Sequence, residues 1–111
     1  MCPMVKKSLN KTTATILVVE DDESLCHLIK RRLDRADFNS EVAFSGAEAI
    51  RRAVATPPAL VLLDYKLPDM PAEEVITALN EHNIAFVIAT GQGDEKTAVA
   101  MMKLGARDYV V

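Results

Sequence analysis

Short apolar runs alternate with amphipathic stretches along this chain. The runs have the length of strands and are rich in β-branched residues; they occupy Ile16–Val19, Glu41–Phe44 (the weakest), Leu60–Leu63, Phe86–Ala89 and Tyr109–Val111. Between them, apolar residues recur at the three- and four-residue spacing of a helix with one buried face. These are Leu25, Leu28, Ile29 and Leu33, then Ala47, Ile50 and Val54, then Val75, Ile76 and Leu79, then Ala98, Val99 and Met102.

Residues at the predicted boundaries agree with this alternation of strands and helices. Ser45 followed by Glu48 has the spacing of a capping box, Asp22 and Asp94 can cap their helices, and Gly105 can end the fourth helix in a left-handed conformation. The strands begin about two dozen residues apart, which leaves room for right-handed crossovers into a parallel sheet. The pattern predicts one α/β domain with an open, doubly wound sheet, in which ILVV and LVLL are central strands.

Acidic residues follow the predicted central strands. Glu20, Asp21 and Asp22 come after the first strand, and Asp64 comes directly after the third. In doubly wound sheets, ligands bind beyond the carboxyl ends of the strands, so these carboxylates are expected to converge. Taken alone, Asp22 is more readily explained as a helix cap and Asp64 as a turn residue.

A group of carboxylates this close together repels itself unless a cation or a proton lies among them. Oxygen ligands without histidine or cysteine suit a hard ion, and few protein ligands leave room for the waters that Mg²⁺ retains. Thr90, which follows the fourth strand, adds a small hydroxyl at the same edge. The sequence therefore predicts a magnesium site with a hydroxyl beside it.

Four segments of the chain resemble the signature blocks of response regulator receiver domains, in the order and at the spacing of that family. The segments are ILVVEDDE (16–23), LVLLDYKLPDM (60–70), VIATGQGD (87–94) and KLGARDYVV (103–111). The resemblance implies a five-stranded, flavodoxin-like sheet of order 2-1-3-4-5. The stretch TGQGDEKTAVAMMKLGARDY looks most like receivers of the nitrogen-regulatory activator class.

The resemblance also implies a role for each matching residue. Asp64 is the phosphoacceptor, Thr90 the switch hydroxyl and Tyr109 the switch aromatic. Mg²⁺ is held by Asp21, Asp64 and the backbone carbonyl of Lys66, with Glu20 acting through water. Lys66 and Gln92 flank the site and control how easily water reaches the phosphoryl group. The family implies a histidine kinase or phosphotransfer protein as donor, a downstream output domain or protein, and no enzyme activity beyond the domain's own phosphorylation and dephosphorylation.

The chain departs from the family pattern in two places. The family continues with Lys-Pro and a fifth helix after the segment DYVV, whereas this sequence ends at Val111. An uncovered sheet face invites pairing with another molecule, so a homodimer is one expectation. Pro71-Ala72 stands where the family commonly has a glycine, and we expect a local change at the start of the third helix, because proline suits a first helical turn.

Composition narrows the remaining choices. The 111 residues allow one domain, which we assign to 15–111 after a flexible leader at 1–14. With 13 basic and 16 acidic residues, a net charge of -3 argues against direct binding of nucleic acid. No apolar run is long enough to cross a membrane, and the two cysteines form no metal or disulfide motif, so a cytoplasmic protein is expected.

Two other functions fit the residues after the first strand less well than a receiver does. A haloacid-dehalogenase-like phosphatase needs its nucleophile after the first strand and a second Asp two residues on. The segment Asp21-Asp22-Glu23-Ser24 does not supply the threonine that follows these, or a cap domain. A dinucleotide-binding module needs a glycine-rich turn after the first strand, and this chain has none at that place. A phosphate-independent docking or dimerisation module, and the receiver of a hybrid sensor kinase, both stay open.

Overall fold

The computed structural model describes residues 14–90 and 95–110. Its elements, in chain order, are β1 (Thr15–Val19), α2 (Glu23–Arg35), β2 (Asn39–Ala43), α3 (Gly46–Ala55), β3 (Leu60–Asp64), α4 (Ala72–Glu81), β4 (Phe86–Ala89), α5 (Glu95–Lys103) and β5 (Tyr109–Val110). Most of the expected leader, the flanking residue Gln92, the helix cap Asp94 and the final Val111 lie outside the described residues.

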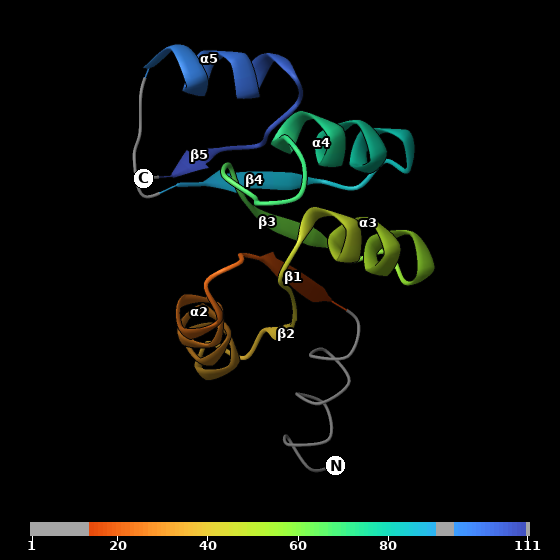
Figure 1. Ribbon diagram of the computed structural model, residues 1–111. Coiled ribbons are helices and arrows are strands. Elements are labelled where there is room, and N and C mark those ends of the chain that lie inside the picture. Colours follow the sequence, from red (N-terminus) through yellow and green to blue (C-terminus); the bar gives the residue numbers. More distant parts are fainter. Residues whose placement is uncertain (1–13, 91–94, 111) are drawn as a thin grey trace.

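The five strands form one parallel sheet in the order β2-β1-β3-β4-β5. This is the predicted doubly wound topology. The chain moves one way from β1 to β2 and the other way for every later strand, so α2 covers one face of the sheet while α3 and α4 cover the other (Figure 1). The sheet order reverses beside β1 and β3, whose carboxyl ends therefore border the crevice where this class of fold binds ligands.

The second strand begins earlier than predicted. β2 covers Asn39–Ala43 rather than 41–44, and its register is set by β1, with Asn39 opposite Thr15. The Asn39 side chain also donates a hydrogen bond to the Thr15 hydroxyl at 3.1 Å. Pairing with a central strand thus recruits two polar residues that the apolar pattern alone leaves out.

The hydrophobic core lies mainly between the sheet and helices α3 and α4. Its largest fully buried side chains, each less than 2% exposed, are Phe86, Leu63, Ile76, Leu79, Ile88 and Met101. The apolar stripe of α4 is buried as predicted, with Val75, Ile76 and Leu79 all inside.

The predicted stripes of the other three helices are partly wrong. Leu25, Leu28, Val54, Val99 and Met102 are 42 to 53% exposed. Smaller or neighbouring residues are buried instead: Cys26 in α2, Ala49 and Ala53 in α3, and Met101 in α5. A helix against a sheet buries the face that the crossover turns inward, and an apolar residue one position away from that face stays in contact with water.

Three helices end in the same way. The residues after α2, α4 and α5 that adopt a positive φ are Asp37 (68°), Asn83 (56°) and Gly105 (107°). In each case, the next backbone N–H reaches back to a carbonyl of the last helical turn, as Ala106 does to Met101 at 3.1 Å. This pairing satisfies carbonyls that a helix end otherwise leaves without partners, and it confirms the predicted role of Gly105.

Candidate metal and phosphoacceptor site

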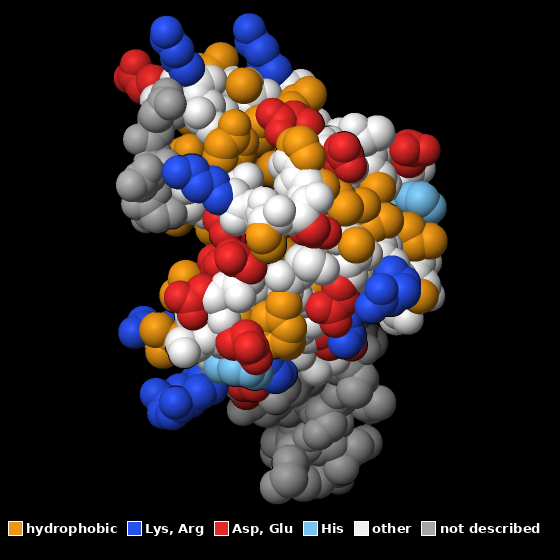
Figure 2. All heavy atoms as spheres, viewed as in Figure 1, with side chains coloured by type: hydrophobic (Ala, Val, Ile, Leu, Met, Phe, Trp, Pro, Cys, Tyr) orange, Lys and Arg blue, Asp and Glu red, His pale blue; other side chains and the backbone are white. Residues whose placement is uncertain are grey.

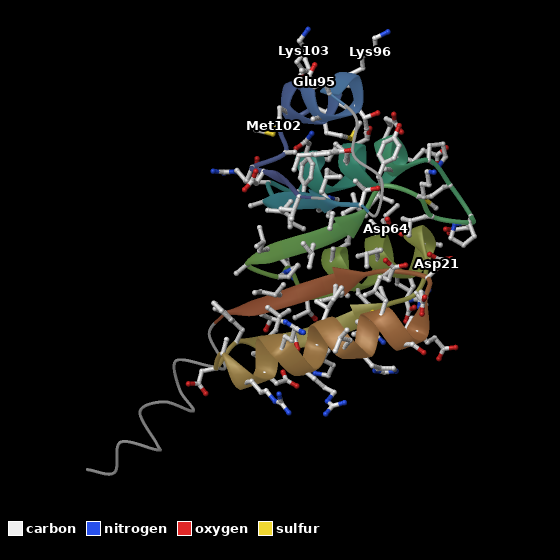
Figure 3. All side chains as sticks on the ribbon, turned by 90° about the vertical axis from the view of Figure 1, so that its left-hand side faces the viewer. Asp21, Asp64, Glu95, Lys96, Met102 and Lys103 are labelled. Carbon is white, nitrogen blue, oxygen red and sulfur yellow. The ribbon has the colours of Figure 1, made fainter. Side chains whose placement is uncertain are left out.

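Three carboxylates meet at the carboxyl ends of β1 and β3. One oxygen from each of Glu20, Asp21 and Asp64 lies within 4.8 Å of the others. Figure 3 shows Asp21 and Asp64 at the same edge of the sheet, and in Figure 2 acidic side chains gather beside an indentation in the surface. The predicted convergence is therefore present. An all-oxygen set of this size fits a hard divalent cation such as Mg²⁺.

Backbone pairing at the strand ends positions these acids. The Glu20 N–H donates to the Ala43 carbonyl at 3.0 Å, which continues the β1–β2 pairing by one residue. Asp64 is the last residue of β3 and lies opposite Ala89 of β4. Because parallel strands end at a common edge, residues separated by more than forty positions in the sequence become neighbours.

The environment of the cluster favours a bound proton or cation. Burial raises the pKa of the Glu20 carboxyl from 4.5 to about 7, and the negative charges of Asp64 and Asp21 add to the shift; the Asp22 N–H, which donates to Glu20 at 3.1 Å, opposes it. Burial also raises the pKa of Asp64, while a hydrogen bond from the Lys66 N–H opposes this change. A divalent ion among these oxygens favours the charged form of both carboxyls and so opposes both pKa shifts.

Asp22 is a helix cap, as its position suggested. It is the N-cap of α2, and its side-chain oxygen accepts a hydrogen bond from the Leu25 N–H at 3.1 Å. Its carboxylate is not part of the three-acid cluster. The geometry thus resolves which two of the three acids in EDD face Asp64: they are Glu20 and Asp21.

Thr90 directly follows β4, the strand next to that of Asp64, and Tyr109 lies on β5, one strand further out. Thr90 follows β4, is only 8% exposed, and donates its backbone N–H to the Val110 carbonyl at 2.9 Å. Tyr109 in β5 pairs with Ile88 and packs against the core. Its hydroxyl is buried and has no hydrogen-bond partner among the described residues.

Asp69 is a structural residue of the site that the sequence analysis missed. Both of its side-chain oxygens accept hydrogen bonds at 2.9 Å, one from the Gly46 N–H and one from the Ala47 N–H, at the start of α3. These bonds lower the pKa of Asp69. They also tie the loop after Asp64 to a neighbouring helix. The partners lie more than twenty positions away, so no local pattern in the sequence indicates the contact.

The start of α4 also differs from ordinary capping. Pro71 is the N-cap of this helix and supplies no side-chain hydrogen bond, so it stands just before the first helical turn rather than within it. At α3, Ser45 accepts from the Glu48 N–H at 3.2 Å as a capping box requires, but the Glu48 carboxylate accepts from the Phe44 N–H, one residue before the cap. Helix α3 is thus capped by the Ser45 side chain, whereas α4 begins after Pro71 without a side-chain cap.

An open parallel sheet with an acidic site at the reversal of strand order defines a ligand-binding α/β domain of the flavodoxin-like class. Residues 16–111 match the family model described as "Response regulator receiver domain". The chain therefore belongs to the receiver domains of two-component response regulators.

Individual relatives agree with this assignment. The chain is similar to the transcriptional regulatory protein SrrA of Staphylococcus aureus, with 36% identity over 97 residues that cover 86% of this chain and 40% of SrrA. It thus spans less than half the length of the curated relatives it matches.

Solved structures of receiver domains are similar in fold. One is a signal receiver domain from Vibrio parahaemolyticus, with 32% identity, a TM-score of 0.82 and coverage of 87% of this chain and 76% of that one. Another is the non-phosphorylated HemR receiver domain of Leptospira biflexa, with 29% identity, a TM-score of 0.79 and coverage of 87% and 80%. The resemblance to the nitrogen-regulatory class stays a prediction. Among the described residues, no helix combines the length and apolar character that crossing a bilayer requires.

Proposed function

We propose that this domain is a phosphorylation switch in which Asp64 accepts a phosphoryl group. The observation that carries the proposal is the meeting of Glu20, Asp21 and Asp64 within 4.8 Å at the switch point of the sheet. Asp64 ends a strand whose backbone is held on both sides, so its carboxylate is presented at a rigid edge. A partly buried, rigidly held oxygen nucleophile beside a cation site suits phosphoryl transfer, which depends on positioning and on charge neutralisation.

Asp21, Asp64 and the backbone carbonyl of Lys66 would hold Mg²⁺ directly, with Glu20 acting through water. When bound, Mg²⁺ offsets negative charge on the phosphoryl oxygens and on the acids themselves. Asp21 is the most exposed member of the cluster, which leaves the site open to an incoming phosphodonor.

The reaction forms one bond and breaks one bond. An oxygen of Asp64 attacks the phosphorus of a phosphohistidine in line with the phosphorus–nitrogen bond. That bond breaks, its electron pair returns to the imidazole of the donor, and the product is an acyl phosphate on Asp64. The residues that this chain contributes keep the attacking oxygen in place and neutralise charge around it.

Thr90 and Tyr109 would carry the change to the surface. The acyl phosphate adds up to about two negative charges and several acceptor oxygens, to which the Thr90 hydroxyl can donate. An inward movement of Thr90 leaves space that the Tyr109 ring can occupy. The buried Tyr109 hydroxyl has no partner among the described residues, which costs about 1 to 3 kcal/mol, so a movement that gives it a partner is favourable. Lys66, beside the site, would control how readily water attacks the phosphoryl group.

The partners follow from this chemistry. The donor would be a histidine kinase or a phosphotransfer protein, and the recipient of the signal a downstream output domain or protein. Because SrrA is a transcriptional regulatory protein, regulation of transcription in the cytoplasm is the output we favour, with direct DNA contact made outside this acidic domain. A receiver in a hybrid sensor kinase would use the same site.

Phosphorylation can be tested without knowing the kinase. We expect incubation with a small phosphodonor and Mg²⁺ to add the mass of one phosphoryl group, as measured by intact mass spectrometry, and we expect a chelator to prevent the gain. A sample without the phosphodonor serves as the control. If the domain gains no mass when Mg²⁺ and the phosphodonor are both present, it is a docking module that does not depend on phosphate.

The response of stability to pH and Mg²⁺ follows from the raised pKa of Glu20. Its pKa rises from 4.5 to about 7 on folding, so without metal the folded protein holds an extra proton between those values, and stability falls as pH rises through about 7. Because the Glu20 carboxyl is only partly buried and water screens its charge, we expect a loss of only about 1 kcal/mol. Mg²⁺ should therefore stabilise the protein more at pH 8 than at pH 5.5, as measured by urea unfolding. Glu20→Gln should reduce this difference, and an equal effect of Mg²⁺ at both values would contradict the prediction.

A further inference from the structure

The loop between β3 and α4 is attached to the rest of the domain at two places. At its start, the Lys66 N–H donates to a side-chain oxygen of Asp64 at 3.3 Å. Near its end, the two side-chain oxygens of Asp69 accept hydrogen bonds at 2.9 Å from the Gly46 and Ala47 N–H groups. Asp69 comes only three positions after Lys66. The intervening loop is therefore held between the acidic site and the start of α3.

Close packing supports the second attachment. Helices α3 and α4 lie side by side on one face of the sheet, and the loop that precedes α4 passes the start of α3 (Figure 1). A Cβ added to Gly46 would lie 2.6 Å from the Cγ of Met70 and 2.8 Å from its Sδ, closer than real Cβ atoms approach. Met70 in turn packs against the core. The loop thus contacts the first residue of α3 at a separation that leaves no room for a side chain there.

The needs of α3 alone do not explain why Asp69 makes this contact. The N-cap of the helix, Ser45, already accepts a hydrogen bond from the Glu48 N–H at 3.2 Å, and Glu48 supplies an acidic group in the first turn. A helix start with these two features is stabilised by its own residues. Because Asp69 belongs to a different segment, its two hydrogen bonds fix the loop on the helix.

We propose that Asp69 is a positioning residue of the acidic site, which holds the loop on α3 and so keeps Lys66 in place for the binding of Mg²⁺. Asp69 is not a member of the three-acid cluster, so it would act only through the loop. The inference rests on the proposed function, in which the backbone carbonyl of Lys66 is a metal ligand. A backbone ligand cannot adjust by turning a side chain, so its position depends on the contacts of the loop that carries it.

Asp69→Ala tests the inference with Mg²⁺ as the only ligand. The substitution removes both hydrogen bonds to α3. We expect Mg²⁺ to bind about tenfold more weakly than to the parent, as measured by isothermal titration calorimetry, because groups that orient metal ligands commonly affect affinity this much. Asp69→Asn keeps one oxygen that can accept one of the two hydrogen bonds, so it should lose less affinity than Asp69→Ala.

A charge control separates position from electrostatic attraction. Asp22→Asn removes a negative charge next to the cluster, keeps the cap of α2 and does not touch the loop. Because salt screens charges on the surface, we expect this variant to lose about twofold or less in Mg²⁺ affinity at physiological ionic strength. A tenfold loss in Asp22→Asn would show that charge alone explains the effect of Asp69, and would overturn the inference.

Ser45→Ala is the matched control for stability. It removes the cap at the same helix start and leaves the hydrogen bonds of Asp69 in place. Loss of an N-cap destabilises a helix, so the urea midpoint of Ser45→Ala should fall at least as far as that of Asp69→Ala. Its affinity for Mg²⁺ should stay that of the parent. If Asp69 only stabilised α3, the two variants would lose Mg²⁺ affinity alike.

Hydrogen exchange in the metal-free protein provides a second measurement. The Lys66 N–H should exchange with solvent faster in Asp69→Ala than in the parent, and Ser45→Ala should not change this rate. The inference is wrong if Asp69→Ala binds Mg²⁺ as tightly as the parent, and in that case the proposed phosphorylation of Asp64 is unaffected. A parent chain that binds no Mg²⁺ would instead overturn the proposed metal site and this inference together.

Discussion

Asp64→Asn removes the gain of a phosphoryl group while leaving the domain folded. The amide that replaces the carboxylate is not a nucleophile for phosphorus, so intact mass should show no adduct after incubation with Mg²⁺ and a small phosphodonor. The substitution also removes one of three mutually repelling carboxylates, and burial already raises the pKa of Asp64. We therefore expect the metal-free variant to unfold at a higher urea concentration than the parent at neutral pH.

Asp22→Asn is the matched control for this experiment. Asp22 lies two residues from Glu20, but its side chain caps α2 through the Leu25 N–H, and asparagine caps helices equally well. This variant should gain the phosphoryl group at the rate of the parent. Treatment with hydroxylamine should remove the adduct from the parent, because acyl phosphates react with it. An adduct that persists in Asp64→Asn would place the acceptor elsewhere.

Phe86→Ala is expected to have the largest effect on stability. Phe86 begins β4, is 1% exposed and is the largest fully buried side chain of the core. Its truncation removes buried apolar surface and leaves a cavity that a parallel sheet cannot readily close. We expect a loss of about 3 to 5 kcal/mol in the free energy of unfolding, measured by urea denaturation. Since single domains are commonly stable by about 5 to 15 kcal/mol, we expect part of the population to unfold at physiological temperature.

Phe38→Ala provides the comparison for this loss. Phe38 has the same side chain but lies between α2 and β2 and is 46% exposed. Its truncation should cost about 1 kcal/mol or less. Similar losses in the two variants would show that burial in β4 does not dominate the stability of the sheet.

Local patterns were sufficient for the order of elements and for their chemistry. Apolar runs of strand length and helical spacing between them predicted the doubly wound sheet, and short-range rules predicted the caps at Asp22, Ser45 and Gly105. The positions of Glu20, Asp21 and Asp64 after central strands predicted the acidic cluster. These inferences succeed because parallel strands bring their carboxyl ends to one edge.

Local sequence patterns did not predict the features that depend on residues far apart in the chain. The start of β2 is decided by pairing with β1, and the role of Asp69 by a helix that begins more than twenty residues earlier. The exposed side of α5 follows from the way the crossover docks, which buries Met101 and leaves Val99 in water.

The amino acids alone were thus enough to specify an α/β receiver fold, its strand-end acids and most of its helix boundaries, because each depends on neighbours in sequence or on a general rule of topology. Which helix faces meet water and which loop is tied to which helix emerged only on folding. Those outcomes depend on contacts between segments that no local pattern links.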